Sequence, residues 1–252
     1  MMVYEEIEDA YDDLAELVVQ TIPPVTETEP TESEEHVTHS VPEGGEAPTE
    51  ETEIVTEESS PYADVVSPIQ VDFETLCAIN PDVVGWLYCE GTVINYPVLK
   101  GESNDTYLYH RYDGTYSSGG SIFMDYRCES DLSDGYTIIY GHNMLADSMF
   151  NCLDYFRKKD YLDEHSRFFY LTPSGENYCF EVICSNLTAY KDELRLFEVR
   201  DDERNLELIR KDADADTGIE ANNEDHLVLL ATCTYDFHNA KYTLLCKAIK
   251  LG

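Results

Sequence analysis

About eight short apolar segments between residues 80 and 249 constrain the fold of this chain more than any other feature. Each is rich in aliphatic or aromatic residues and is bounded by Gly, Pro, Asn, Asp or Ser, the residues that favour turns. Short strands with turns at roughly regular spacing are typical of barrels. The sequence therefore predicts a mainly β fold with peripheral helices, built as an antiparallel barrel. The predicted strands lie within residues 80–89, 91–99, 119–125, 136–140, 167–171, 178–185, 227–233 and 242–249.

The first quarter of the chain differs in character from the rest. Apolar residues at helical spacing, with acids on the opposite face, predict an amphipathic helix over residues 1–20. Residues 21–66 are mostly Thr, Glu, Pro and Ser and cannot bury enough apolar surface to offset the entropy of ordering. We predict that they form an acidic, disordered linker that acts as a tether. Residues 67–252 are the predicted globular domain, in which residues 72–79 and 148–161 have helical spacing.

Acidic residues outnumber basic ones by 52 to 16, which gives a net charge of −36. Residues 1–66 hold 20 of these acids and neither Lys nor Arg. Contacts to nucleic-acid phosphates need clustered Lys and Arg, so the composition excludes nucleic acid as a partner. It also disfavours binding to anionic membrane surfaces. No run of 18 apolar residues occurs, and the sequence predicts no membrane-spanning helix.

The chain has eight cysteines, and none of them has the spacing of a metal site. Neither a CxxC motif nor a Cys/His ligand pattern is present, so we expect no zinc and no other cofactor. The acids of residues 212–218 alternate as in a calcium loop, but the position that needs glutamate is Asn223. Five cysteines lie in apolar runs and are predicted to be core residues, because a free cysteine behaves as a small hydrophobe. They are Cys77, Cys89, Cys179, Cys184 and Cys246.

Cys233 differs from these cysteines because it ends a predicted strand and precedes a polar, turn-prone segment. A thiol in that position is held in place and accessible, as a nucleophile must be, although a buried core cysteine is the alternative interpretation. A thiolate nucleophile needs a cationic or proton-accepting neighbour, and imidazole is the side chain that titrates in the right range. Two histidines meet this need: His142, after the strand at 136–140, and His238, on the loop after Cys233.

Six motifs occur in a characteristic order across roughly residues 72–250. They are Asn80-Pro-Asp-Val-Val-Gly-Trp86, Asn95-Tyr-Pro-Val98, Asn104 with Tyr107-Leu108, Gly120-Ser-Ile-Phe-Met-Asp125, Ile139-Tyr-Gly-His-Asn-Met144 with Met149-Phe150, and Ala231-Thr-Cys-Thr-Tyr235. In this order and spacing they resemble the class B sortases, the cysteine transpeptidases of Gram-positive surfaces. The resemblance implies an eight-stranded sortase-type barrel with a helix-bearing insertion between strands 6 and 7, here residues 186–225.

The resemblance also implies roles for individual residues. Cys233 corresponds to the nucleophile and His142, in preference to His238, to the general acid. The third functional residue of the family is an arginine on the last strand, and Lys241 stands at its expected position. Arginine offers a planar fork of donors for a peptide backbone or an oxyanion, whereas lysine offers one compact ammonium.

The neighbours of these residues are candidates for substrate binding. They are Thr232, Tyr140, Asn143 and Tyr235. Each has a purely structural alternative, as a strand or loop residue beside the site.

The implied reaction is a two-step acyl transfer. A C-terminal sorting motif of a secreted surface protein is cleaved through a thioacyl intermediate on Cys233, and the acyl group passes to an amine of peptidoglycan or of a pilin lysine. The enzyme is expected at the extracellular face of the membrane or in the cell wall, held by an anchor that is missing from this chain. Lys241 keeps open a weakly active or non-catalytic sortase-like binding module. A cysteine protease that resolves the thioester with water is the other alternative.

Overall fold

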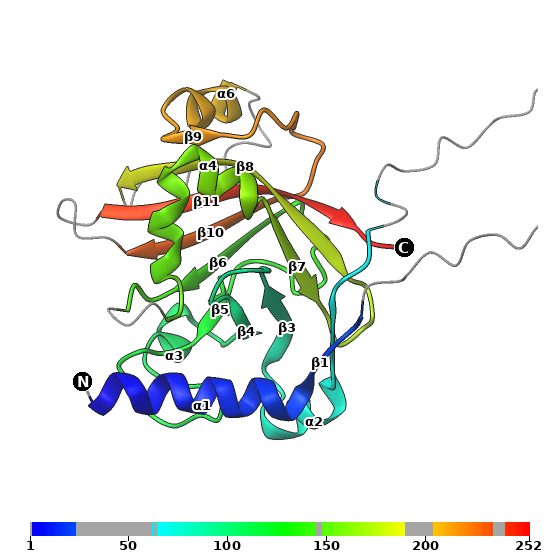
Figure 1. Ribbon diagram of the computed structural model, residues 1–252, viewed down its shortest axis with the longest axis vertical. Coiled ribbons are helices and arrows are strands. Elements are labelled where there is room, and N and C mark those ends of the chain that lie inside the picture. The colour runs from blue at the N-terminus through cyan, green and yellow to red at the C-terminus, as the bar shows by residue number, and fades with distance from the viewer. Residues whose placement is uncertain (1, 24–61, 63–64, 145–147, 190–203, 234–239) are drawn as a thin grey trace, which may run out of the picture.

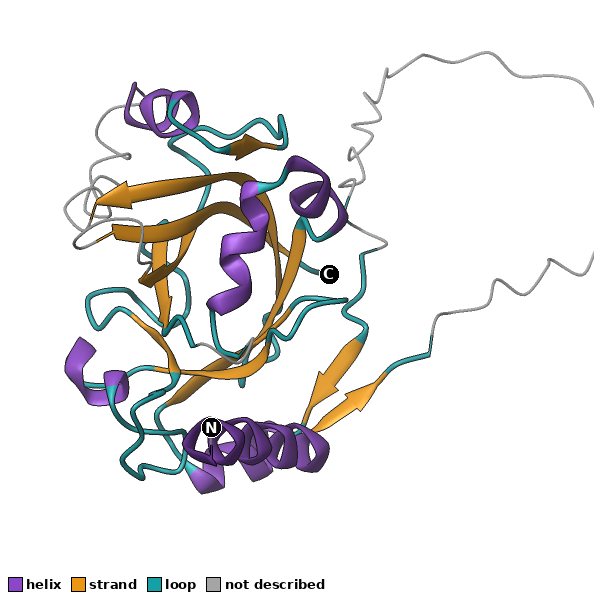
Figure 2. Cartoon of the chain, turned by 60° about the vertical axis from the view of Figure 1, so that its left-hand side comes forward, coloured by secondary structure: helices purple, strands orange, loops and turns teal. Residues whose placement is uncertain are grey.

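The computed structural model describes residues 2–23, 62, 65–144, 148–189, 204–233 and 240–252, and its centre is a closed barrel of eight strands (Figure 1, Figure 2). The strands follow the order β11-β10-β6-β5-β4-β3-β7-β8, and pairing of β11 with β8 closes the ring. Their bounds are β3 (Val83–Tyr88), β4 (Asn95–Leu99), β5 (Ile122–Met124), β6 (Tyr136–Gly141), β7 (Arg167–Leu171), β8 (Tyr178–Ala189), β10 (Leu227–Cys233) and β11 (Ala240–Lys250). The predicted eight-stranded barrel is confirmed.

The prediction that all strands run antiparallel was wrong for two pairs. β10 lies parallel to β6, and β4 lies parallel to β5. Parallel neighbours need a long crossover between them, and the chain provides one in each case. β7, β8 and the segment up to residue 226 separate β6 from β10, and α3 (Asn104–Leu108) lies between β4 and β5. Alternation of apolar residues does not encode strand direction, so the pattern could not show this.

β10 is buried on both faces. Val228 and Leu230 point into the barrel core, which also contains Leu244 of β11. Leu227 and Leu229 belong to a second apolar cluster with Leu206 of α6 (Arg204–Lys211). A strand that is covered on both sides needs a continuous aliphatic run, as residues 227–230 provide.

The segment between β8 and β10, the sixth and seventh barrel strands, carries α6 and the short strand β9 (Ala215–Asp216), as predicted for the insertion. β9 pairs with β8 outside the ring of eight strands. β8 itself continues to Ala189, beyond the predicted start of the insertion at residue 186.

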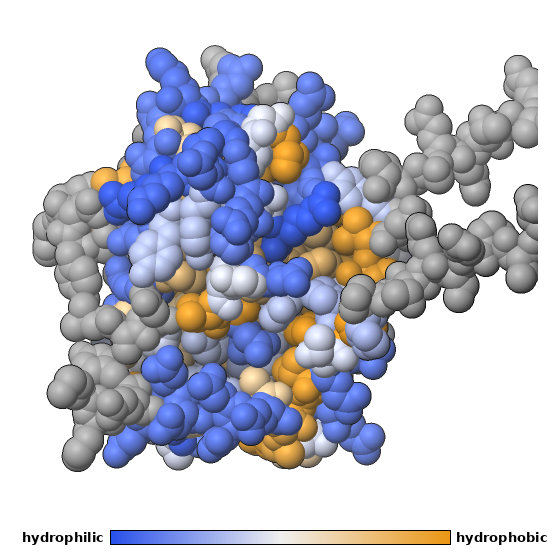
Figure 3. Space-filling model, in the orientation of Figure 1, coloured by the Kyte–Doolittle hydropathy of each residue, from blue (hydrophilic) through white to orange (hydrophobic). Residues whose placement is uncertain are grey.

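The N-terminal helix, α1 (Met2–Val18), packs along the barrel (Figure 1). Tyr11 and Leu14 are buried, and the Tyr11 hydroxyl donates to the Gly120 carbonyl at 2.9 Å. The side of α1 that faces solvent is hydrophilic along most of its length (Figure 3). The helix ends at Val18, and β1 (Val19–Thr21) follows and pairs with β2 (Ile69–Val71), ahead of α2 (Phe73–Ile79).

Most of the predicted linker, residues 21–66, lies outside the described residues. Within the described part of the chain, no helix combines the length and the apolar character needed to cross a bilayer.

The predicted helix over residues 148–161 is two shorter helices. A 3-10 helix, η1 (Asn151–Arg157), precedes α4 (Lys159–Glu164), and Lys158 between them has extended backbone angles. The buried residues Phe150, Leu153 and Phe156 recur every third position. That spacing matches the three residues per turn of a 3-10 helix, so it places these rings and the leucine on one face.

Four of the five cysteines that were predicted to be core residues are buried, namely Cys89, Cys179, Cys184 and Cys246. The fifth, Cys77 on α2, is only half-buried.

Candidate active site

The three candidate catalytic residues lie on or next to three adjacent strands, at the same end of the barrel. β10 is between β6 and β11, and Thr232 pairs with Gly141 as the last matched pair of β10 and β6. Cys233 and His142 each follow that pair by one residue. Cys233 pairs across β11 with Lys241. The fold therefore brings the backbone positions of Cys233, His142 and Lys241 together from three distant parts of the sequence.

The side chain of Cys233 and residues 234–239 lie outside the described residues. Two residues considered from sequence, Tyr235 and His238, fall within that segment.

Gly141 sets the direction in which His142 points. A Cβ atom on Gly141 would lie 2.5 Å from the Ile122 Cδ1 atom and 2.7 Å from the Phe150 Cγ atom. Both neighbours belong to the barrel core, so the inner side of residue 141 is filled and only glycine fits there. The next residue, His142, is half-buried and lines a pocket on the outer face.

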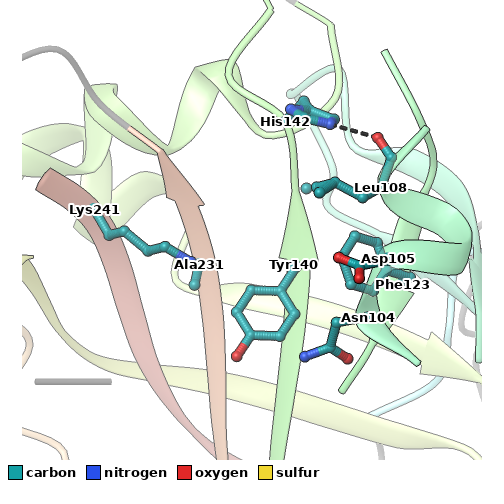
Figure 4. A pocket seen from close by; sticks show the side chains of 9 residues that line it. Asn104, Asp105, Leu108, Phe123, Tyr140, His142, Ala231 and Lys241 are labelled. Atoms are coloured by element: carbon teal, nitrogen blue, oxygen red, sulfur yellow. Dashed lines mark hydrogen bonds between the residues drawn. The ribbon is translucent and has the colours of Figure 1, made fainter. Parts of the chain in front are cut away.

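The His142 ring is oriented by a backbone carbonyl. Its Nε2 atom lies 2.7 Å from the oxygen of Leu108, the last residue of α3 (Figure 4). A carbonyl oxygen only accepts, so we assign the proton to Nε2, which leaves Nδ1 as the nitrogen that can take up or release a proton. The backbone of His142 is also fixed, because its carbonyl accepts from the Phe150 N–H at 3.0 Å.

A pocket of about 180 Å³ opens beside these residues (Figure 4). Its walls come from α3, the end of β6 and the paired ends of β10 and β11, with β5 at its base. Figure 4 shows Lys241 and Ala231 on one side of Tyr140, and the α3 residues and His142 on the other. The lining residues are Asn104, Asp105, Leu108, Phe123, Tyr140, Gly141, His142, Ala231 and Lys241.

Lys241 and Tyr140 are in direct contact. The Lys241 ammonium lies 4.7 Å from the centre of the Tyr140 ring, in the range of a cation–π interaction. Such contacts contribute about 0.5–2 kcal/mol, depending on their exposure to solvent. The Tyr140 ring also packs against Phe123, with 5.4 Å between the ring centres. The aromatic pair thus supports a positive charge at the edge of the pocket.

Beneath the pocket, the Tyr140 hydroxyl donates to the carboxylate of Asp125 at 3.1 Å. Asp125 is fully buried. Burial raises its pKa, but hydrogen bonds from the side chain and backbone of Arg127 and from Asn104 outweigh burial and lower the pKa to about 2. Asp125 is therefore ionised at neutral pH.

The four predicted substrate-binding residues have different positions. Tyr140 lines the pocket. Thr232 does not, because it pairs with Gly141 and so shares the face that points into the barrel, where it is 1% exposed. Asn143 is half-buried outside the pocket, and its side-chain oxygen accepts from the Asn151 amide at 2.5 Å. Tyr235 lies outside the described residues.

Sequence reasoning about the site missed several pocket residues. Asn104, Leu108, Phe123 and Ala231 each occur within one of the sequence motifs, so that membership was the available signal. Asp105 had no such signal, since it is an exposed acid in a chain rich in acids.

The chain is similar to proteins named sortase B. It is 36% identical over 169 residues to sortase B of Listeria monocytogenes, which covers 66% of this chain and 68% of the relative. Among solved structures, sortase B of Clostridium perfringens is 32% identical with a TM-score of 0.65, and the match covers 70% of this chain and 99% of that one. The Staphylococcus aureus sortase B–substrate complex is 30% identical with a TM-score of 0.66, covering 71% and 85% of the two chains.

No protein-family model matches the chain. The curated relative and the solved structures nevertheless agree with one another in sequence, in extent and in fold. The chain therefore belongs to the class B sortases, a family of cysteine transpeptidases.

Proposed function

We propose that Cys233, His142 and Lys241 carry out a two-step acyl transfer from a sorting-motif peptide to an amine. The observation that supports this assignment most is the strand register, which puts Cys233 opposite Lys241 and one residue beyond the pair that precedes His142. A nucleophile, a proton carrier and a cation around one pocket are the groups that thioester chemistry requires.

In the first step, the Cys233 thiolate attacks the carbonyl carbon of a threonine in the sorting motif. The carbon–nitrogen bond of the peptide breaks, and His142 gives its proton to the leaving amine. In the second step, an incoming amine attacks the thioester, loses a proton to His142, and displaces the thiolate. Each step forms one bond to the acyl carbon and breaks another, so the enzyme is regenerated.

Lys241 supplies positive charge for the tetrahedral intermediate. The negative oxygen of that intermediate is stabilised by donors placed in advance, here the Lys241 ammonium together with backbone N–H groups near Cys233. Because the ammonium is held over Tyr140 at 4.7 Å, little reorganisation is needed when the charge develops. Tyr140 and the other pocket residues would contact the peptide.

The proposed substrates are C-terminal sorting motifs of secreted surface proteins, and the proposed acceptors are amines of peptidoglycan or of a pilin lysine. Among the relatives, the Staphylococcus aureus enzyme has been solved with triglycine, and a Streptococcus pyogenes class B sortase is involved in pilus biogenesis. Membership of the family associates the chain with the cell surface or wall. We place the enzyme at the extracellular face of the membrane, with residues 21–66 as its tether.

Selective labelling of Cys233 tests this proposal directly. A methanethiosulfonate reagent should modify Cys233 at least about tenfold faster than any other thiol, because only an activated cysteine is largely thiolate at neutral pH. The other thiols are suited as references. Burial raises the pKa of the half-buried Cys77, and it raises the pKa of Cys89, Cys128 and Cys184 to about 12. Mass spectrometry of the labelled peptides gives the rates, and equal labelling of Cys233 and Cys77 would contradict the assignment.

Product analysis separates transfer from hydrolysis. A library of fluorescent peptides with threonine at the cleavage position is incubated with the full chain, with and without an added amine. Transfer predicts an amide product whose yield rises with amine concentration. A carboxylic acid product at every amine concentration would favour the protease alternative instead. The family membership already disfavours the non-catalytic binding module.

Lys241→Arg is expected to raise kcat/KM for transfer by roughly fivefold. A guanidinium can stack on Tyr140 as the ammonium does and can also donate two parallel hydrogen bonds, which lysine cannot. Lys247→Arg is the matched control, since Lys247 lies on the same strand and pairs with Asp225 at 2.9 Å, away from the pocket. Steady-state kinetics with the best library peptide measures the effect. An unchanged or lower value would show that the site is adapted to lysine.

A further inference from the structure

Asp125 is a buried charged residue to which the proposed chemistry gives no role. It follows β5 directly, its exposure is 0%, and it does not line the pocket. A buried carboxylate is costly unless it is paired and hydrogen-bonded. The partners of Asp125 show what this residue does for the site.

Three side chains donate hydrogen bonds to the Asp125 carboxylate. Arg127 binds both oxygens at 2.8 Å, and its backbone N–H lies 3.0 Å from Oδ1. The Asn104 amide donates to Oδ2 at 3.0 Å, and the Tyr140 hydroxyl donates to the same oxygen at 3.1 Å. Arg127 thus balances the charge, while Asn104 and Tyr140 connect the carboxylate to the pocket.

Asn104 and Tyr140 belong to different walls of that pocket. Asn104 begins α3, and Tyr140 lies on β6. Asn104 is held at both ends of its amide, because its oxygen also accepts from the Tyr126 N–H at 3.0 Å. One carboxylate oxygen therefore fixes the distance between two walls of the groove.

The influence of Asp125 extends to the Lys241 ammonium. A phenol that donates to a carboxylate cannot rotate freely, and its ring is richer in electrons than that of an unbonded phenol. Both effects favour a cation over the ring face, where the Lys241 ammonium lies at 4.7 Å. Asp125 therefore acts on Lys241 through Tyr140, without contacting substrate.

We propose that Asp125 is a positioning residue that sets the substrate groove by orienting Tyr140 and Asn104 and, through Tyr140, the Lys241 ammonium. This inference rests on the proposed function, since it assigns the pocket to the sorting-motif peptide. It adds a determinant of peptide affinity that lies outside the pocket itself.

Asp125→Asn is expected to raise KM for the best library peptide by about tenfold, because a small displacement of positioning groups has large kinetic effects. The rate of Cys233 modification by a small methanethiosulfonate reagent should change by less than about twofold, since that reaction does not use the groove. A merely structural role would lower the active fraction and the melting temperature but leave KM unchanged.

The matched control is Asp113→Asn. Asp113 also pairs with an arginine two positions away, Arg111, at 2.5 Å, but this pair is partly exposed and does not line the pocket. Loss of an exposed pair has little effect, so KM should stay within about twofold of the parent.

A double-mutant cycle with Tyr140→Phe tests the route of action. This variant keeps the ring and removes the hydroxyl that donates to Asp125. If Asp125 acts through Tyr140, the effect of Asp125→Asn on KM should shrink by about fivefold in the Tyr140→Phe background. Effects that multiply independently, or an unchanged KM in a folded Asp125→Asn protein, would overturn the inference.

Tyr140→Phe alone keeps the test valid if Asp125→Asn does not fold. It must raise KM without changing the labelling rate of Cys233, and an unchanged KM would again overturn the inference. Failure of the proposed function has a different signature, which is cleavage that persists in Cys233→Ala.

Discussion

Cys233→Ala is expected to lower peptide cleavage and amine transfer by about 10⁴–10⁶-fold, to the uncatalysed level. The alanine keeps the strand and its pairing with Lys241 but removes the sulfur on which the acyl group is carried. The remaining groups of the site can bind and polarise a peptide, but they provide no nucleophile of their own. Quenched fluorescent peptides give the cleavage rate, and mass spectrometry detects the thioacyl enzyme in the parent.

Cys77→Ala is the matched control for this experiment, because Cys77 is the half-buried thiol on α2 and lies outside the pocket. It should retain activity within about twofold, as expected for a substitution away from the site. Substantial activity in Cys233→Ala would reject the thioester mechanism.

His142→Gln is expected to lower kcat by about 10²–10⁴-fold, the usual contribution of a general acid–base group. The glutamine amide can still donate to the Leu108 carbonyl, which the imidazole approaches at 2.7 Å, so the loop should keep its conformation. It cannot transfer a proton, and it cannot balance a thiolate as an imidazolium does. The labelling rate of Cys233 should therefore fall together with kcat.

His165→Gln provides a control with the same kind of contact. The His165 ring lies 3.0 Å from the Glu90 carbonyl, as the His142 ring lies near that of Leu108, but it is not among the pocket residues. Its activity should match the parent. If both histidine variants behave alike, the role assigned to His142 is wrong.

The strand pattern of the barrel was predictable because burial leaves a local signature. The continuous aliphatic run at residues 227–230 predicted a strand covered on both faces, and α6 and the barrel core do cover it. The direction of the strands was not predictable. β6 and β10 pair in parallel although nearly the whole second half of the chain separates them, and no local pattern records such a pairing.

Within the site, motif order predicted the catalytic residues but not their surroundings. Thr232 illustrates the limit, because adjacency to Cys233 suggested a place in the pocket. Side chains alternate along a strand, so the neighbour of an outward-facing residue points inward, and Thr232 is buried beside Gly141. The helical spacing at residues 148–161 likewise did not distinguish an α-helix from the 3-10 helix η1.

By itself, the sequence determined the barrel class, the family, the nucleophile and its histidine, because these depend on local apolar runs and on motifs in a fixed order. Only the tertiary structure decided which side chains meet at the pocket. Asn104, Asp125, Tyr140 and Lys241 come from four separate elements, and their contacts exist only once the ring of strands is closed. The physical reason is that hydrogen bonds and cation–π contacts act over a few ångströms in space, whatever the separation along the chain.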